Sequence, residues 1–262
     1  MAIVFKVKPW YKKSGGSYSG IWVPKTWTGL TNFDGDRVWT DGTNIYWSSG
    51  STQYVLDKAT STWVLKTWSG LTSFDGENVW TNGTDIYYTS GVDQYVLDKS
   101  TSTWSQITLG RTVTGQYIWT DGTDIYYSRS STHYVLNKST SKFTVKTWSG
   151  LTSFTGNYIW TDGTDIYYSS GSATSQYVLN KSTSTWSAKT WIGLTSVDGR
   201  YVWTDGTDIY YSSSSYQYVL DKATSTWSQK TWQGLTSFNG KYIWKDGDHI
   251  YYSRNGDNYE LT

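Results

Sequence analysis

The stretch Val38–Trp47 reads Val-Trp-Thr-Asp-Gly-Thr-Asn-Ile-Tyr-Trp, and five close copies of it follow along the 262-residue chain. Each copy has a tryptophan at its second position, and these tryptophans are separated by 41, 39, 41, 43 and 41 residues. A fixed period of this size is typical of repeat architectures such as solenoids and propellers. The six tryptophans are Trp39, Trp80, Trp119, Trp160, Trp203 and Trp244.

Each copy contains four candidate strands, as the second copy illustrates. Its strands are expected at 78–81, at 85–89, at 94–98 and from Thr103 through Trp104. The first two are joined by Thr-Asn-Gly-Thr, and Asn-Gly or Asp-Gly favours a type I′ hairpin turn because both residues accept positive φ angles. A polar Asp-Lys-Ser-Thr-Ser turn joins the last two. Gly, Ser and Thr interrupt every candidate helical window, so no helix is predicted.

The strands are apolar or aromatic on both faces, as in Ile86-Tyr87-Tyr88, so both faces of each sheet are expected to be buried. Sheets of four strands that are covered on both sides and arranged radially are propeller blades. The sixth copy stops after its third strand, whereas residues 21–27 match residues 62–68, which hold a fourth strand. The sequence therefore predicts an all-β, six-bladed propeller of four-stranded antiparallel blades, closed by the N-terminal strand. Residues 21–262 form the propeller, and residues 1–20 form a basic arm or linker.

Composition excludes several classes of function. The formal net charge is +1, and no basic stripe is present, which argues against a nucleic-acid partner. There is no cysteine, so neither a disulfide nor a thiolate metal site is possible. No stretch reaches the roughly 20 apolar residues of a membrane helix, so no membrane insertion is expected. Residues 1–8 lack the apolar run of a signal peptide, which predicts synthesis and retention in the cytoplasm unless the protein is assembled into a larger particle.

Catalytic residues are not apparent. The two histidines, His133 and His249, occupy different positions in different copies and are expected in surface loops. Asp121-Gly122-Thr123-Asp124 lacks the dense oxygen ligands of calcium loops, and a tight turn explains it better. No zinc spacing occurs. The sequence therefore predicts a protein that is not an enzyme and that uses no cofactor or metal.

Variation among the copies is concentrated in two connections, from the fourth strand to the next blade and from the second strand to the third. Both connections lie on the same rim of a propeller, and recognition commonly resides where loops vary on a rigid scaffold. Tryptophans beside small polar and charged side chains suit sugars, although a tryptophan repeated in five blades also fits packing between blades. The candidate binding residues are Trp27, Trp68, Trp148, Trp191, Trp232, Asp93, Arg111, Arg129, Tyr216 and Arg254.

Two resemblances extend this reading. Residues 54–63, Tyr-Val-Leu-Asp-Lys-Ala-Thr-Ser-Thr-Trp, resemble the third strand and following turn of kelch repeats, although the second strand lacks the Gly-Gly with which kelch repeats usually end it. Residues 8–16 resemble short segments of tailed-phage structural proteins from Gram-positive hosts, and the repeats resemble propellers encoded in such phages. The candidate docking residues of the arm are Lys6, Lys8, Trp10, Lys12 and Lys13.

The resemblances imply a phage virion appendage or decoration protein that binds a bacterial surface glycan or another virion protein. Two alternatives remain open at this point. One is a free lectin-like module that binds carbohydrate without a virion, and the other is a scaffold whose rim contacts another polypeptide. The sequence does not decide the ligand or the oligomeric state.

Overall fold

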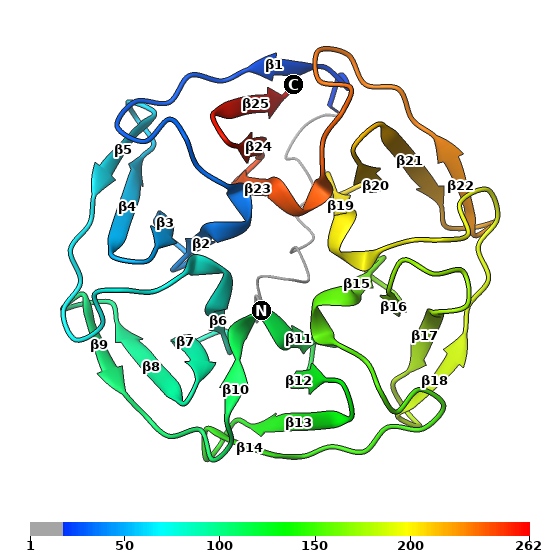
Figure 1. Cartoon of the computed structure of the whole chain (residues 1–262), viewed down its shortest axis with the longest axis horizontal. Helices are drawn as coiled ribbons and strands as arrows, with labels where there is room; N and C mark the ends of the chain where they lie inside the picture. Colours follow the sequence, from blue (N-terminus) through cyan, green and yellow to red (C-terminus); the bar gives the residue numbers. More distant parts are fainter. Residues whose placement is uncertain (1–17) are drawn as a thin grey trace.

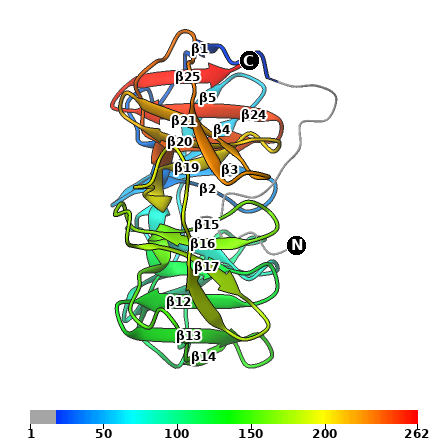
Figure 2. The same ribbon diagram turned by 90° about the vertical axis from the view of Figure 1, so that its right-hand side faces the viewer.

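The computed structural model describes residues 18–262, which form six antiparallel sheets arranged around a central axis (Figure 1). Figure 2 shows the ring edge-on, with the strands of the blades stacked along its height. The predicted all-β, six-bladed propeller is confirmed. The docking residues Lys6, Lys8, Trp10, Lys12 and Lys13 lie outside the described residues.

Five blades take all four of their strands from one copy, with the first strand innermost and the fourth at the outer wall. In blade 2 the short strand β10 (Val113–Thr114) adds to β7, opposite Ser90 and Gly91. The strands of these blades are β2 (Val38–Thr40), β3 (Ile45–Ser49), β4 (Thr52–Asp57) and β5 (Thr62–Leu65) in blade 1; β6 (Val79–Thr81), β7 (Ile86–Gly91), β8 (Asp93–Asp98) and β9 (Thr103–Gln106) in blade 2; β11 (Ile118–Thr120), β12 (Ile125–Arg129), β13 (Thr132–Asn137) and β14 (Lys142–Val145) in blade 3; β15 (Ile159–Thr161), β16 (Ile166–Ser169), β17 (Gln176–Asn180) and β18 (Thr185–Ala188) in blade 4; β19 (Val202–Thr204), β20 (Ile209–Ser213), β21 (Tyr216–Asp221) and β22 (Thr226–Gln229) in blade 5.

Blade 6 closes the ring with strands from both ends of the chain. It contains β23 (Ile243–Asp246), β24 (His249–Arg254) and β25 (Asp257–Leu261), and its outermost strand is β1 (Trp22–Pro24). β1 lies antiparallel to β25, with Trp22 opposite Leu261, and the C-terminus lies beside β1 in Figure 1. The predicted closure is therefore confirmed, and β1 covers the edge of β25 that would otherwise lack a partner strand.

Aromatic side chains fill the space between blades, as the first copy shows. Residues 45–48 of β3 are all buried, which agrees with sheets covered on both faces. Trp39 is 1% exposed, stacks on Tyr46 with ring centroids 4.5 Å apart, and donates its indole N–H to Ser48 Oγ at 2.9 Å. The hydrogen bond satisfies the buried donor, so a large aromatic residue can occupy the innermost strand without an unpaired polar group.

The turn between the first and second strands differs from the predicted type I′ hairpin. Four residues, 41–44, connect β2 to β3, and among them only Gly42 has a positive φ, of 93°. Asp41 is not in the left-handed region because its Oδ1 instead accepts hydrogen bonds from the backbone N–H groups of Thr43 and Asn44, at 2.9 and 2.7 Å. The aspartate side chain thus closes the turn itself.

The prediction that no helix forms is wrong for six single-turn 3-10 helices that precede the innermost strands. Each begins with a glycine, and each contacts the next one around the ring near the axis (Figure 1). They are η1 (Gly35–Arg37), η2 (Gly76–Asn78), η3 (Gly115–Tyr117), η4 (Gly156–Tyr158), η5 (Gly199–Tyr201) and η6 (Gly240–Tyr242).

The connections divide into two rims, as predicted. The backbone N–H of Phe74, between blades 1 and 2, donates to Gly50 in the β3–β4 hairpin at 2.8 Å, and Phe154 makes the same bond to Ser130. On the other side, Lys58 in the β4–β5 turn pairs with Asp246 at 2.6 Å. We call the side with the second-to-third hairpins and the interblade connections the variable rim, and the other side the constant rim.

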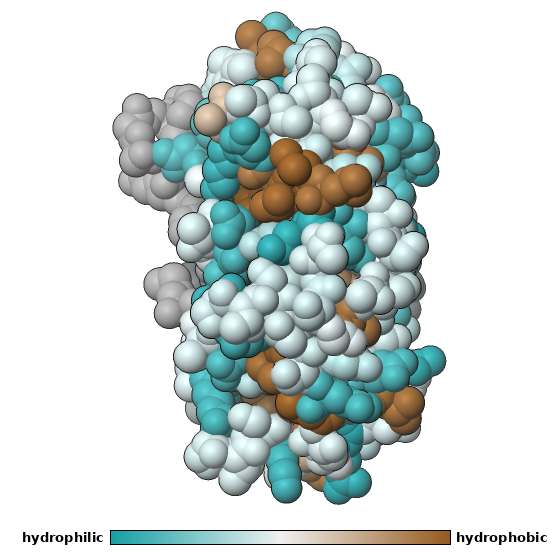
Figure 3. Space-filling model, turned by 90° about the vertical axis from the view of Figure 1, so that its left-hand side faces the viewer, coloured by the Kyte–Doolittle hydropathy of each residue, from teal (hydrophilic) through white to brown (hydrophobic). Residues whose placement is uncertain are grey.

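On the side of the ring that Figure 3 shows, most of the surface is polar, and an apolar area lies over β5 of blade 1. Val64 and Leu65 are 48% and 70% exposed there, whereas the corresponding positions in blades 2 and 5 are Ser-Gln. Val145, which corresponds to Leu65 in blade 3, is 66% exposed, so the outer wall is apolar at this position in some blades and polar in others.

Candidate ligand-binding site

The five candidate tryptophans of the interblade connections are buried. Trp68 lies between two blades, 5.7 Å from Trp39 of blade 1 and 6.0 Å from Trp104 of blade 2, measured between ring centroids. The amino group of Lys66 lies over the same ring at 4.7 Å. This burial assigns the rings to packing between blades, the second of the two roles that the sequence left open, and no face is left for a sugar. The exposed fractions are 3% for Trp27, 4% for Trp68, 4% for Trp148, 3% for Trp191 and 3% for Trp232.

The connection from blade 2 to blade 3 departs from this arrangement. It is two residues shorter than the others and has Leu109 in place of the tryptophan, while Phe143 replaces the tryptophan of the fourth strand. Leu109 and Val113 are both fully buried against Trp80, and the closest aromatic contact of Trp80 outside its own blade is Phe143, at 6.0 Å. Smaller side chains thus close this interface.

Gln94 forms hydrogen bonds to the short connection from blade 2 to blade 3. Its Nε2 donates to the carbonyl oxygen of Arg111 at 2.6 Å, and its Oε1 accepts from the backbone N–H of Leu109 at 2.8 Å. The corresponding side chains Gln53 and Gln217 also donate to their interblade connections, at the carbonyl oxygens of Phe74 and Phe238. The Oε1 atoms of both, however, are buried without a hydrogen-bond partner. Only in blade 2 does this glutamine use both ends of its amide, so the short connection is held in a defined position.

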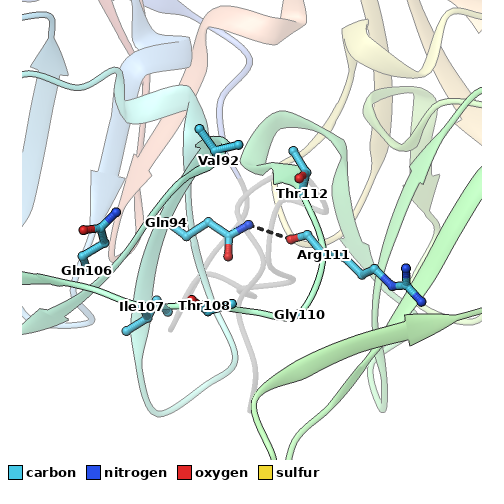
Figure 4. Close-up of a pocket in the computed structure, with 8 residues that line it drawn as sticks. All are labelled: Val92, Gln94, Gln106, Ile107, Thr108, Gly110, Arg111 and Thr112. Atoms are coloured by element: carbon cyan, nitrogen blue, oxygen red, sulfur yellow. Dashed lines mark hydrogen bonds between the residues drawn. The ribbon is translucent and has the colours of Figure 1, made fainter.

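A pocket of about 590 Å³ opens beside this connection (Figure 4). This volume is within the range of small-molecule sites, about 300–1,000 Å³. Arg111 is its only charged lining residue, and Val92, which is 77% exposed, offers an apolar surface. In Figure 4 the Arg111 side chain extends from the pocket toward blade 3. The lining residues are Val92, Gln94, Gln106, Ile107, Thr108, Gly110, Arg111 and Thr112.

Two of the predicted arginines are held on tyrosines of blade 3. The Arg111 guanidinium lies 5.5 Å from the ring centroid of Tyr134, and that of Arg129 lies 5.3 Å from Tyr117. Tyr134 stacks on Tyr127 at 5.7 Å, and Tyr127 meets Tyr117 edge-on at 6.2 Å, so the five side chains form one continuous row. Burial raises the pKa of Tyr127, and nearby Arg129 opposes this shift. Among residues 18–262 neither arginine makes an ion pair.

The other predicted rim residues are spread around the ring. Asp93 is exposed and follows Val92 in the hairpin at the pocket edge. Tyr216 is 64% exposed on blade 5, and Arg254 lies over Tyr242 at 4.8 Å on blade 6. The structure therefore brings Asp93, Arg111 and Arg129 to blades 2 and 3 and leaves the remaining two on other parts of the variable rim.

Two rim arginines were not singled out in the sequence. Arg200 pairs with Asp198 at 2.7 Å and lies 4.8 Å from the Tyr158 ring, and Arg37 pairs with Asp75 at 3.6 Å. A sequence signal was available, because the chain's five arginines all fall in the interblade connections, the glycine-led turns or the second-to-third hairpins. They are Arg37, Arg111, Arg129, Arg200 and Arg254.

The expectation that both histidines lie in surface loops is wrong for His133. It is 6% exposed, stacks on Phe154 at 4.5 Å, and pairs its Nε2 with the Thr152 carbonyl at 2.9 Å. It occupies in blade 3 the position that Gln94 occupies in blade 2, and burial lowers its pKa. His249 is exposed, but it is the first residue of β24 rather than part of a loop, and it pairs with Glu260 at 2.7 Å.

Asp121, in the turn weighed as a calcium loop, binds its own turn. Its Oδ1 accepts from the backbone N–H groups of Thr123 and Asp124, and its Oδ2 accepts from the Tyr126 hydroxyl at 3.1 Å. Within residues 18–262 no group of three or more acidic or histidine side chains is placed to hold a metal ion. The same part of the chain contains no helix with the length and hydropathy needed to span a bilayer.

Comparison with known proteins identifies the fold. No family model and no curated protein matches the chain. Among solved structures, the extracellular domain of the hybrid two component system BT3049 from B. thetaiotaomicron matches with a TM-score of 0.55 and 13% identity, over 88% of this chain and 40% of that one. Two structures of the BT4673 extracellular domain from the same organism match with TM-scores of 0.51 and 0.53, at 10% and 11% identity, over 86% of this chain and 33% of theirs.

This chain therefore spans less than half the length of the solved structures that it resembles. At these identities the likeness concerns the fold alone, which hosts many functions. The kelch resemblance remains one of sequence pattern.

Proposed function

We propose that this protein is a non-enzymatic binding module that recognises a bacterial surface glycan on its variable rim, at the pocket between blades 2 and 3. One observation carries the proposal: the single interface that departs from tryptophan packing is also where an open pocket of about 590 Å³ lies. A defect in packing without a function would be expected to collapse, whereas Gln94 holds this connection by two hydrogen bonds.

The lining suits a sugar. Val92 and Ile107 supply apolar contact for C–H groups, and Gln106, Thr108 and Thr112 supply hydrogen-bonding groups for hydroxyls. A mixture of a few polar groups with apolar surface is the usual make-up of small-ligand sites. Rim tryptophans are not part of this proposal, because they are buried.

Binding to a glycan array, with matched rim variants, tests the proposal. Thr112→Trp places a large ring in the pocket, and Ser237→Trp makes the corresponding change in the connection from blade 5 to blade 6, where Ser237 is exposed. We expect the wild-type protein and Ser237→Trp to bind the same glycans and Thr112→Trp to lose them. Binding that survives in Thr112→Trp would place the site elsewhere, and a wild-type protein that binds no glycan would overturn the proposal.

We further propose that the module acts as a phage virion appendage, attached through its basic arm. This part rests on the resemblance of residues 8–16 and of the repeats to phage structural proteins. Purification of particles from a lysate that contains the protein tests it. Co-sedimentation lost on deletion of residues 1–17 supports attachment, whereas a protein that stays free of particles would leave the lectin-like alternative.

A further inference from the structure

The acidic residues of the chain are unevenly distributed between the rims. Between Asp93 and Asp198 the sequence contains five carboxylates, and all five lie on the constant rim, four in turns and one at the end of β8. The same span of the variable rim, which covers blade 3 and blade 4, has no carboxylate, and its charged side chains are Arg111 and Arg129 together with Lys146 and Lys189 at the starts of two interblade connections, where each lysine lies over a buried tryptophan and donates to a serine hydroxyl. The five constant-rim carboxylates are Asp98, Asp121, Asp124, Asp162 and Asp165.

The neighbouring part of the variable rim has the opposite character. Blades 1 and 2 place Asp36, Asp75, Glu77 and Asp93 on it. Arg37 pairs with Asp75 in this part of the rim, and Arg200 pairs with Asp198 in the connection from blade 4 to blade 5. Arg111 and Arg129 are thus distinguished from these arginines by their surroundings, because no carboxylate of residues 18–262 neutralises them within 4 Å.

The two guanidinium groups are also held in place. Each lies over the ring of a tyrosine of blade 3, and the two tyrosines are joined through Tyr127. A guanidinium whose face covers a ring still has its in-plane N–H groups available, and these match the two oxygens of a carboxylate or a phosphate. Side chains fixed before binding lose less conformational entropy when they meet a ligand.

From this arrangement, which rests on the proposed function, we propose that the glycan is acidic: one anionic group, a carboxylate or a phosphodiester, binds Arg111 at the pocket, and a second along the same chain binds Arg129. The sugar next to the first acid group occupies the pocket lined by Val92 and Ile107. Asp93 at the pocket edge repels the anion and so limits its affinity.

The test measures binding of the full chain to three immobilised polymers: polygalacturonic acid, its methyl ester as the neutral counterpart, and polyglycerol phosphate. Variants are Arg111→Gln, Arg129→Gln, the double variant, and Lys99→Gln, which removes the same charge from the constant rim. Thermal unfolding of each variant confirms that the fold is intact.

We expect at least one acidic polymer to bind about tenfold or more tightly than the methyl ester, as loss of a charge-assisted hydrogen bond implies. Each arginine variant weakens the binding about tenfold, and Lys99→Gln leaves it unchanged. Binding weakens as salt is added. Preference for the carboxylate polymer identifies an acid sugar as the ligand, and preference for the phosphate polymer identifies a phosphodiester.

Asp93→Asn provides a second readout, because removal of the like charge strengthens binding of an anion and does not strengthen binding of a neutral sugar. Equal binding of the neutral and acidic polymers, with no loss in Arg111→Gln or Arg129→Gln, overturns the acidic-glycan inference and leaves the proposed function standing. Equal binding of this kind is expected if the pocket binds the sugar ring and the arginines do not contact the acid groups. Failure of every glycan to bind overturns both.

Discussion

The interface between blades 2 and 3 and the one between blades 1 and 2 are formed by corresponding strands, but different side chains pack between them. Between blades 1 and 2, Trp39, Trp68 and Trp104 meet with ring centroids 5.7–6.1 Å apart. Between blades 2 and 3, Trp80 meets Leu109 and Phe143 instead. The comparison teaches that the ring tolerates a smaller interface when the connection is shortened to match, and that the shortened connection leaves a pocket on the variable rim.

The largest expected effect on stability comes from removing tryptophan-packed interfaces between blades altogether. Deletion of residues 1–27 takes away β1 and with it Trp22, which packs on Trp203 at 6.0 Å, and Trp27, which packs on Trp244 at 5.5 Å. Blade 6 then has an exposed edge at β25, and exposed edges pair with other chains. We expect an open chain that aggregates, as measured by light scattering and thermal unfolding. A deletion variant that stays monomeric with an unchanged Tm would show that closure contributes little.

A single tryptophan tests how strongly an ordinary interface depends on its indole rings. Trp68→Ala removes a buried ring from the contact between blades 1 and 2, and a cavity of that kind costs about 3–5 kcal/mol in unfolding free energy. Denaturant unfolding measures the change. A loss below about 1 kcal/mol would mean that the connection can rearrange around the missing ring, as the connection with Leu109 does.

Two glycines at corresponding positions give a sharper comparison between the interfaces. Gly70 and Gly110 have similar positive φ angles, 82° and 78°. A Cβ at Gly70 would overlap the Trp104 carbonyl oxygen, whereas a Cβ at Gly110 would lie 3.4 Å from the Lys142 Cβ, in ordinary contact. Left-handed backbone costs about 1–2 kcal/mol in both Gly→Ala variants.

The clash adds about 1–3 kcal/mol at Gly70 alone. We therefore expect Gly70→Ala to lower the unfolding free energy by more than Gly110→Ala, measured under identical conditions. Equal losses would mean that the connection next to Gly110 is as tightly packed as the others and would argue against a permanent pocket.

Much of the fold was predictable because the repeat itself carries the information. The period, the both-face apolar strands such as Ile86–Tyr88, and the match between residues 21–27 and 62–68 specify blades, their number and their closure. The 3-10 helices were missed because a single turn led by one glycine has no periodicity to detect. The prediction of a type I′ turn was wrong because the Asp41 carboxylate accepts hydrogen bonds from the backbone N–H groups that would otherwise define the turn.

The site was less predictable than the fold. Arg111 and Arg129 were expected on one rim, but periodicity does not reveal whether a repeated tryptophan such as Trp68 is buried or exposed. The pocket arises from a deletion of two residues, and its volume depends on how far the neighbouring backbone closes over it. His133 could have been placed by alignment of the copies, because it falls in register with Gln53, Gln94, Gln176 and Gln217.

His133 gives the smallest predicted effect and a comparison between blade 3 and its neighbours. Burial lowers the pKa of His133, and its hydrogen bond to the Thr152 carbonyl partly opposes that shift. Its Nδ1 is buried without a hydrogen-bond partner, so a proton there has no acceptor in the folded state. The unfolded chain binds this proton near pH 6.5, above the folded pKa, so the stabilisation is complete above that pH and is lost as the pH falls through the folded pKa.

His133→Gln supplies the matched variant, because glutamine occupies the same place in blades 1, 2, 4 and 5 and donates there to a backbone carbonyl. Both proteins keep every other titratable group, so the difference between their unfolding free energies isolates the histidine. We expect that difference to shift in favour of the variant as the pH is lowered from about 7 to 5, measured by denaturant unfolding across the range. If the unfolding free energies of the two proteins changed with pH in parallel, blade 3 would open at His133 readily enough to solvate the charged ring. The interface between blades 3 and 4 would then be looser than its aromatic packing indicates.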